Sequence, residues 1–240
     1  MTDIKAFVIH PDRLKERGEH IDQMLHGIGM DYEFINEGHD EHQVKAYIDR
    51  YLRDGKEPMR QRVPRSLCTI SHFLVYERIV ADGLEGAVVF EDDIVLHSNF
   101  MPRFQQSISE YRQRFADESV LISYEDSSLR FVPRSQRREG LMLYPAKKGR
   151  MSGAYYINRI GAQAILDELR RERCDEGIDW YHNQLFDKGI VHCLWCQPAL
   201  ATQGSFTGEF HSSLTNKKYT AATMKWWMKR SYKRLLYWFR

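Results

Sequence analysis

Short apolar runs alternate with amphipathic stretches along most of the chain, and this alternation predicts a sheet covered by helices. Residues 4–9 and 32–35 have the pattern of strands, and residues 13–26 between them place apolar positions at helical spacing. A strand, a helix and a second strand in this order imply a right-handed crossover and a parallel strand pair. The pattern therefore predicts an α/β fold with a mostly parallel central sheet.

The rest of the chain continues this pattern. Ser66 is expected to cap a helix with a buried apolar face, and Asn158 is expected to cap another. Further helices are expected over residues 41–52, 99–115 and a stretch after 175 that includes Trp180, and further strands over 120–123, 141–144, 153–157 and 191–196. Most of the basic segment 125–150 is interpreted as either a cover over an anionic substrate or a solvated loop.

Residues 86–96 contain the clearest candidate for a functional site. An apolar run predicts a buried strand, and Glu91, Asp92 and Asp93 stand at its carboxyl end. Ligands of open α/β sheets bind outside the carboxyl ends of strands, where three carboxylates would repel one another unless a cation joined them. Oxygen ligands suit Mg²⁺ or Mn²⁺, which share their remaining positions with phosphates. The pattern fits a metal–diphosphate site, or alternatively an acidic, solvated turn.

Other side chains near this end of the sheet also allow two interpretations. Arg13 and Arg17 follow the first strand, where they could bind a diphosphate or lie as solvated charges on a helix. Ser71 and His72 point about a hundred degrees apart on their helix, so they are not a nucleophile and its base. His72 is interpreted as structural, and a substrate contact is the alternative. Asp179 opens a helix, where it suits both a cap and a general base.

Composition and length are those of an ordinary globular protein. The 240 residues, 42% hydrophobic and 28% charged, suffice for one α/β domain and an appendage. No stretch has the apolar length of a transmembrane helix, and no signal-peptide pattern precedes the first strand, so a cytoplasmic location is expected. Four cysteines suggest no disulfide framework. Cys193 and Cys196 would face opposite sides of a strand, which disfavours a metal or redox role.

The formal net charge of +2 hides a division between a body and a tail. Residues 212–240 contain eight Lys and Arg and no acid, and subtracting this +8 from the total leaves −6 for residues 1–211. A helical projection from Ala222 puts an apolar stripe on one side and basic residues on the other. The stripe is Met224, Trp227, Met228, Leu235, Trp238 and Phe239, the basic side is Lys229, Arg230, Lys233 and Arg240, and Trp226 and Tyr237 break the pattern.

A basic amphipathic helix rich in tryptophan is typical of an interfacial anchor on anionic lipid. The tail is therefore expected to lie on the inner face of the cytoplasmic membrane, near lipid-linked glycan acceptors. The alternative is a helix that packs its aromatic face on the body or on a second chain. A nucleic-acid partner is not expected, because the body is net acidic.

Four motifs in series resemble glycosyltransferase family 25, the family of lipooligosaccharide and lipopolysaccharide galactosyltransferases to which collagen galactosyltransferase domains also belong. The motifs cover residues 4 to about 203. They are the first strand with Asp12-Arg13 and Arg17, the segment Cys68-Thr-Ile-Ser71-His72, the strand Val88-Val-Phe-Glu91-Asp92-Asp93, and Ser152-Gly153-Ala154-Tyr155 followed by Asn158-Arg159-Ile160-Gly161-Ala162 and Ile178-Asp179-Trp180.

The resemblance implies a GT-A type nucleotide-binding sandwich, a UDP-sugar donor, usually UDP-galactose, and inversion at the anomeric carbon. Glu91 and Asp93 match the acidic motif that binds Mn²⁺ or Mg²⁺, and His211 is the candidate for a further ligand. Asp179 falls where inverting enzymes of this fold often have the acid that deprotonates the acceptor hydroxyl. The residues assigned to the donor site are Arg13, Arg17, Ser71, Asp92 and Gly153.

The sequence thus predicts a metal-dependent, inverting hexosyltransferase. It would move galactose from UDP-galactose to a lipooligosaccharide, lipopolysaccharide or related surface glycan. A glycosyltransferase domain is expected over residues 1–211 and a membrane-associating tail over residues 212–240. A non-catalytic protein of the same fold that binds sugar nucleotides or glycans is the alternative, and a nucleotidyl- or phosphotransferase is a third hypothesis.

Overall fold

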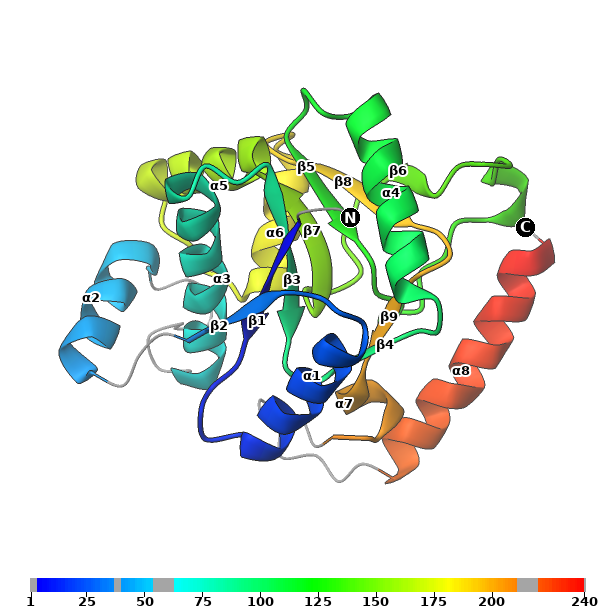
Figure 1. Cartoon of the computed structure of the whole chain (residues 1–240), viewed down its shortest axis with the longest axis horizontal. Coiled ribbons are helices and arrows are strands. Elements are labelled where there is room, and N and C mark those ends of the chain that lie inside the picture. Colours follow the sequence, from blue (N-terminus) through cyan, green and yellow to red (C-terminus); the bar gives the residue numbers. More distant parts are fainter. Residues whose placement is uncertain (1–3, 37–39, 54–62, 211–219, 240) are drawn as a thin grey trace.

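A sheet of seven strands, in the order β2-β1-β3-β7-β5-β8-β6, lies at the centre of the part of the chain that the structure describes (Figure 1). This computed structural model describes residues 4–36, 40–53, 63–210 and 220–239. Only β7 and β6 run against the other strands of the described sheet. The strands are β1 Lys5–Ile9, β2 Tyr32–Ile35, β3 Gly86–Glu91, β5 Val120–Ser123, β6 Leu143–Ala146, β7 Ala154–Asn158 and β8 His192–Cys196. The predicted α/β fold with a mostly parallel sheet is confirmed.

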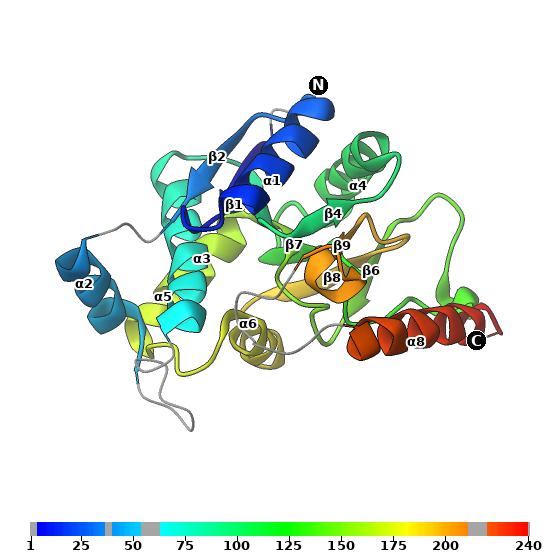
Figure 2. The ribbon, with the colours of Figure 1, turned by 90° about the horizontal axis from the view of Figure 1, so that it is seen from below.

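Helices cover both faces of the sheet. In β3, Ala87 and Val89 enter a core shared with α3, α5 and α6, whereas Val88 and Phe90 enter a second core shared with α1 and α4. Figure 2 shows α1 and α4 on one side of the sheet and α5 and α6 on the other. The helices are α1 Lys15–Gly27, α2 Glu41–Tyr51, α3 Val63–Ala81, α4 Phe100–Arg114, α5 Arg159–Arg171 and α6 Ile178–Asp187. Because both faces are buried, the central strands are apolar at consecutive positions.

The topology gathers several strand ends at one edge of the sheet. The carboxyl ends of β1, β3, β5 and β8 lie there with the amino end of β7, since β7 is antiparallel to both β3 and β5. Ile9 is paired with Glu91, and Phe90 with Ala154. The acidic segment after β3 therefore lies between the turn after β1 and the residues that precede β7.

The chain does not continue straight through the acidic segment. It turns at Asp92 and Asp93 and enters β4 Ile94–Leu96, which pairs antiparallel with β9 Ala201–Gln203 in a separate two-stranded ribbon. This ribbon was not predicted, because its two strands have three residues each and lie about a hundred residues apart in sequence.

Three of the predicted helix features are corrected by the structure, and one is confirmed. Ser66 lies inside α3 and is not its cap, and Gly177 rather than Asp179 is the N-cap residue of α6. Trp180, expected at an apolar position, is 60% exposed. Asn158 does cap α5, since its Oδ1 accepts a hydrogen bond of 2.9 Å from the backbone N–H of Gly161. A cap follows from where the helix begins, which apolar periodicity fixes only to within a turn.

The basic segment 125–150 is anchored to the body at both ends, while residues 134–136 and 138–140 between these ends are exposed, as in a solvated loop; a cover over a substrate stays a prediction. Arg150 is completely buried and donates to the carbonyl oxygen of Cys196 at 2.8 Å. Arg130 donates to the carbonyl oxygen of Gly149 at 2.7 Å, and Phe131 is buried. The predicted strand of this segment begins two residues late, at Leu143.

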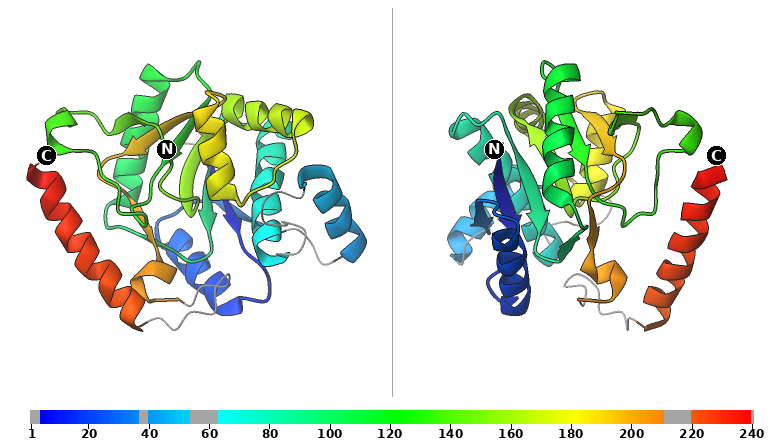
Figure 3. Two further views of the ribbon diagram at one scale, coloured as in Figure 1. Left: turned by 180° about the vertical axis from the view of Figure 1, so that it is seen from behind. Right: turned by 45° about the vertical axis from the view of Figure 1, so that its right-hand side comes forward.

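The C-terminal helix α8 Thr220–Phe239 packs along the side of the body, next to the short helix α7 Gly204–Thr207 (Figure 3). Trp226 is buried with Leu129 and Phe131, and its Nε1 donates to the carbonyl oxygen of Ser127 at 3.0 Å. Arg230 is buried as well. The side chains of α8 that contact the body include both residues that break the pattern, Trp226 and Tyr237, and two of the predicted basic side, Arg230 and Lys233.

The apolar stripe of α8 faces solvent. Its six side chains are between 44% and 79% exposed, namely Met224, Trp227, Met228, Leu235, Trp238 and Phe239. Two members still contact the body, since Nε1 of Trp227 donates to the carbonyl oxygen of Thr207 at 3.3 Å and the guanidinium of Arg134 lies 4.2 Å from the ring centre of Trp238. The helix thus packs aromatic side chains on the body, as the alternative predicted, while most of the stripe is exposed; packing on a second chain stays a prediction. Within the described ranges, no helix combines the length and the apolarity needed to span a bilayer.

Candidate active site at the acidic end of β3

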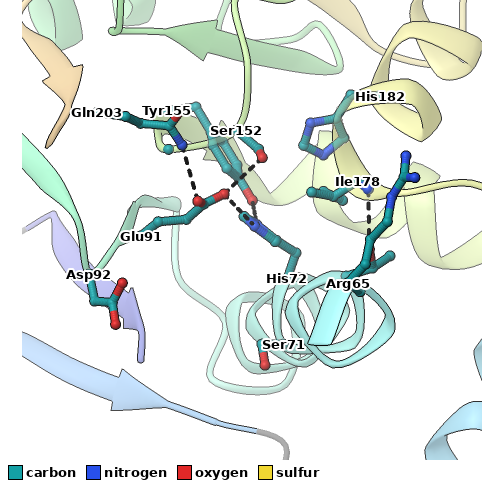
Figure 4. Close-up of polar contacts among 12 residues, drawn as sticks. Arg65, Ser71, His72, Glu91, Asp92, Ser152, Tyr155, Ile178, His182 and Gln203 are labelled. Atoms are coloured by element: carbon teal, nitrogen blue, oxygen red, sulfur yellow. Dashed lines mark hydrogen bonds and ion pairs between the residues drawn. The ribbon is translucent and has the colours of Figure 1, made fainter. Parts of the chain in front are cut away.

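Glu91 points into a cluster of polar side chains from four other elements or their flanking turns (Figure 4). Its Oε1 accepts from the hydroxyl of Ser152 at 2.9 Å, and its Oε2 accepts from Nε2 of Gln203 at 3.1 Å. Nε2 of His72 lies 3.6 Å from Oε1. Burial raises the pKa of Glu91, and the nearby charge of Asp92 raises it further, against the lowering effect of these hydrogen bonds.

Asp92 points away from Glu91, toward α1 (Figure 4). Its carboxylate contacts Nη1 of Arg17 at 2.8 Å and Nδ1 of His10 at 3.0 Å, and all three side chains are buried. The repulsion expected among three neighbouring acids is thus reduced by a buried guanidinium and by the turn that separates the carboxylates. Arg17, predicted to bind the donor, has an acidic partner inside the protein.

Asp93 has an unsatisfied oxygen. Its Oδ1 is buried without a hydrogen-bond partner, and its Oδ2 lies 4.0 Å from Nη2 of Arg17. Burial, followed by the charge of Glu91, raises the pKa of Asp93 to about 6. A buried carboxylate oxygen with no donor is costly for the fold, and a bound cation would remove that cost.

His72 belongs to this cluster, although it was interpreted as structural. It is completely buried, and its Nδ1 lies 2.7 Å from the hydroxyl of Tyr155. That hydroxyl contacts the hydroxyl of Tyr76 at 2.8 Å, which in turn contacts Nε2 of His182 at 2.7 Å. Burial lowers the pKa of His72 to about 3, so its imidazole is neutral. The Nε2 atom that faces Glu91 has no hydrogen-bond partner.

Two further acids complete the site, Glu125, which is buried, and Asp179, which is partly buried. Asp179 in the first turn of α6 has one buried oxygen, Oδ1, without a partner, and burial, followed by the charge of Glu91, raises its pKa to about 6. Glu125, two residues beyond the end of β5, accepts from the backbone N–H of Gly153 at 2.7 Å. Burial raises the pKa of Glu125 well above its usual range. The edge of the sheet therefore contains carboxyl groups of different proton affinity, as general acid–base sites do.

The remaining residues assigned to the donor lie as follows. Ser71 is buried and donates to the carbonyl oxygen of Leu67 at 3.0 Å, pointing away from Glu91 (Figure 4). Gly153 lies against Gln203, because a Cβ at this position would be 2.6 Å from Nε2 of Gln203. Arg13 is exposed in the turn after β1. His211 lies outside the described residues, so its predicted role as a metal ligand stays a prediction.

Three members of the site were not predicted, namely Glu125, Ser152 and Gln203. Glu125 follows an apolar strand, as Glu91 does, and this position at the carboxyl end of a strand could have identified it. Ser152 opens one of the four motifs of the family resemblance, although it was not assigned to the site, and Gln203 carries no comparable pattern. They reach Glu91 only because β7 pairs with β3 and because the ribbon of β4 and β9 closes beside them.

Two sets of side chains could hold a metal ion. Glu91 and Asp93 offer hard carboxylate oxygens, which suit Mg²⁺ or Mn²⁺. Cys68 and His72 on α3 offer a thiol and an imidazole beside the same Glu91, and their ligand atoms and a carboxylate oxygen of Glu91 all lie within 4.8 Å of one another. Among the described residues, only this second set brings three such side chains so close together.

Residues 3–178 match the family model of glycosyltransferase family 25, described as an LPS biosynthesis protein. The match covers most of the chain and includes Cys68, His72, Glu91 and Ser152, which come together in the site. This chain belongs to glycosyltransferase family 25. Asp179 lies one residue beyond the matched range. The family membership predicted from the motifs is therefore confirmed.

The similarity to a curated protein covers a short segment, and the similarity to a solved structure is distant in sequence. The Bos taurus protein named "Probable inactive glycosyltransferase 25 family member 3" is 44% identical over 43 residues, which are 18% of this chain and 7% of that protein. The chain thus matches less than a tenth of the length of this curated relative. A solved structure of a predicted glucose-1-phosphate thymidylyltransferase from Bacillus anthracis, in complex with a sucrose, aligns over 97% of this chain and 96% of its own, with 12% identity and a TM-score of 0.44.

Proposed function

We propose that this family 25 protein is a metal-dependent, inverting glycosyltransferase that moves a hexose, expected to be galactose from UDP-galactose, to a lipooligosaccharide, lipopolysaccharide or related surface glycan. The observation that carries this proposal is the environment of Asp179. Its carboxyl group is largely buried, has one unpartnered oxygen and a pKa of about 6, and lies near Glu91 at the acidic end of β3. This is the environment of a general base that works near neutral pH.

The proposed step is a single displacement at the anomeric carbon. The acceptor hydroxyl loses its proton to Asp179, its oxygen bonds to the anomeric carbon, and the bond from that carbon to the diphosphate oxygen breaks, so that UDP leaves. Attack from the face opposite the leaving group inverts the configuration. A carboxylate with pKa about 6 is mostly ionised at pH 7 and still accepts a proton readily.

Glu91 and Asp93 are the proposed ligands of the metal that acts on the donor. The unpartnered Oδ1 of Asp93 supports this assignment, because a cation would satisfy a buried oxygen that has no donor. When bound, Mn²⁺ or Mg²⁺ would offset the charge that develops on the departing diphosphate. Arg17 pairs with Asp92 at 2.8 Å and lies 4.0 Å from Oδ2 of Asp93, so its guanidinium is closer to Asp92 than to Asp93.

Thermal unfolding with a panel of sugar nucleotides tests the donor class. With Mn²⁺ present, UDP-galactose at a hundredfold excess over its Kd should raise the melting temperature by about 5 °C or more, because a ligand that binds only the folded state stabilises it by mass action. The shift should need the metal and disappear in Asp93→Asn. Asp117→Asn, which changes an exposed acid after α4, should keep the shift.

Two results would contradict the proposal. No shift with any UDP-sugar, with or without metal, would argue against the donor class. A metal-dependent shift without release of UDP in the presence of glycan acceptors would favour a non-catalytic binding protein, an alternative that the name of the bovine relative makes worth testing.

We further propose that α8 holds the protein on the inner face of the cytoplasmic membrane. The exposed apolar stripe from Met224 to Phe239 lies on a helix that also exposes Lys225, Lys229 and Arg234, and the combination suits a bilayer with anionic headgroups. Buried contacts of Trp226 and Arg230 fix the other side of the helix to the body. The stripe would therefore be presented to lipid without unfolding of the helix.

Co-sedimentation of the full chain with vesicles tests this surface. Vesicles with anionic lipid should bind the protein, and zwitterionic vesicles should bind it more weakly. The double variant Leu235→Glu/Phe239→Glu should bind anionic vesicles at least about tenfold more weakly, because two side chains that are 60% and 79% exposed would no longer enter the interface. Ile160→Glu, which adds a charge at another exposed apolar residue, is the control. If the wild type, the double variant and Ile160→Glu bound anionic vesicles equally well, the stripe would not be the membrane-binding surface.

A further inference from the structure

Cys68 and His72 stand one helical turn apart on α3 and face the same carboxylate. The spacing i, i+4 puts two side chains on one side of a helix. Glu91, at the end of the neighbouring strand β3, completes a group whose ligand atoms lie within 4.8 Å of one another. The three residues are held by two rigid elements, and β3 is a central strand of the sheet. This arrangement differs from a surface cluster of acids because one member is a thiol and one is an imidazole.

Nε2 of His72 is the decisive atom. His72 is completely buried, and Nε2 has no hydrogen-bond partner although Oε1 of Glu91 lies 3.6 Å away. That separation is too long for a hydrogen bond. It is, however, close to the distance between two ligand atoms of one tetrahedral metal ion, about 3.3–3.8 Å for nitrogen, oxygen and sulfur ligands.

The hydrogen-bonded chain behind His72 can prepare it as a ligand. The contacts from His72 through Tyr155 and Tyr76 to His182 can all point in one direction or all in the other. In one direction Nδ1 of His72 donates to Tyr155, and Nε2 then presents a lone pair to Glu91. Metal-bound histidines commonly use their second ring nitrogen in this way. In the other direction Nε2 carries the proton. The direction of donation in this series of hydrogen bonds can therefore reverse without the loss of a hydrogen bond.

We propose that Cys68, His72 and Glu91 form a binding site for a borderline-soft divalent ion of the Zn²⁺ class. Thiolate and imidazole ligands select such ions over Mg²⁺ and Mn²⁺. Three protein ligands leave a fourth position open to water or to another group. Because Glu91 is also a proposed ligand of the donor's metal, the two ions would compete for one carboxylate. Only this last consequence rests on the proposed function; binding of the ion does not.

Co²⁺ is the probe, because its complexes with thiolates absorb in the near ultraviolet by charge transfer. The metal-free full chain, titrated with Co²⁺ under reducing, oxygen-free conditions, should develop this absorption and saturate at one ion per chain. The band should be absent in Cys68→Ser, and His72→Ala should weaken binding at least about tenfold through loss of one ligand. Cys193→Ser, which changes another buried thiol, is the matched control and should keep the band.

X-ray absorption of the Zn²⁺-loaded wild-type protein gives a test that needs no variant. One sulfur neighbour at about 2.3 Å and nitrogen or oxygen neighbours at about 2.0 Å are expected. A zinc ion with only nitrogen and oxygen neighbours, no charge-transfer band at saturating Co²⁺, or a band that persists in Cys68→Ser would overturn the proposal. These measurements use no sugar nucleotide, so their failure would leave the glycosyltransferase proposal standing, and failure of the nucleotide test would leave this site standing.

Discussion

Asp179→Asn is expected to lower kcat for hexose transfer by about 10²–10⁴-fold while the metal-dependent thermal shift with the sugar nucleotide persists. The amide has the shape of the carboxylate but cannot accept the proton of the acceptor hydroxyl. Donor binding should survive because the proposed metal ligands, Glu91 and Asp93, are unchanged. Asp175→Asn is the matched control, since Asp175 precedes α6 by three residues and pairs with Arg53 at 3.1 Å. Turnover by Asp179→Asn within threefold of wild type would remove Asp179 as the base.

The same variant should be more stable than the wild type at neutral pH. The pKa of Asp179 rises from 3.8 to about 6 on folding, so the native state binds this proton more tightly and stability falls as the pH rises through that interval. Asparagine resembles the protonated acid, so the variant avoids the cost of burying an ionised carboxylate. The gain in melting temperature should therefore be full at pH 7 and shrink toward pH 4. In the wild type, kcat/KM should decline as the pH falls below about 6, because the base becomes protonated.

Arg230→Ala is expected to destabilise the protein by about 3 kcal/mol, the lower end of the range for breaking a buried ion pair. Nη2 of Arg230 donates to Oδ2 of Asp126 at 2.8 Å, and the two residues are 8% and 1% exposed. Removing the guanidinium leaves a buried carboxylate whose other oxygen has only the hydroxyl of Thr202, at 2.6 Å. Arg234, at 3.6 Å from Asp126, replaces part of the lost interaction.

Urea unfolding of the full chain measures this effect. Arg234→Ala is the matched control, because its side chain is 58% exposed and an exposed pair contributes less than about 1 kcal/mol. Adding Asp126→Asn to Arg230→Ala should recover part of the loss, since the buried charge is then gone. Equal destabilisation by Arg230→Ala and Arg234→Ala, or no recovery in the double variant, would show that the buried pair does not hold α8 on the body.

This ion pair also connects α8 with the proposed active site. Asp126 follows Glu125, whose carboxylate binds the backbone of Gly153, and Thr202 precedes Gln203, whose amide donates to Glu91. Loss of the α8 contacts would loosen both segments at once. The contacts of the proposed site are thus connected to a helix that lies outside the central sheet.

The sequence by itself predicted the parts that depend on short-range pattern. β1, β3 and β5 were predicted nearly to the residue, because strands buried on both faces are apolar at consecutive positions, and the edge strand β2 was predicted equally closely although it is only partly buried. Glu91 was recognised as a site residue because the carboxyl end of a parallel strand is where ligands bind. Asn158 was recognised as a cap because its side chain accepts a hydrogen bond from a backbone N–H only three residues away, that of Gly161.

Tertiary structure alone decided the partners of these residues. The interpretation of His72 as structural agrees with its complete burial, but nothing within its helix shows that β3 brings Glu91 to 3.6 Å from its Nε2. Gln203 and Ser152 reach the same carboxylate from segments 112 and 61 residues away in sequence. The side of α8 that docks on the body was likewise not predicted. A helical projection reveals which face is apolar, but here a buried aspartate about a hundred residues earlier makes Arg230 and Trp226 the docking side and leaves the apolar stripe outside. Local periodicity thus determines the elements, and pairing between distant segments determines the site.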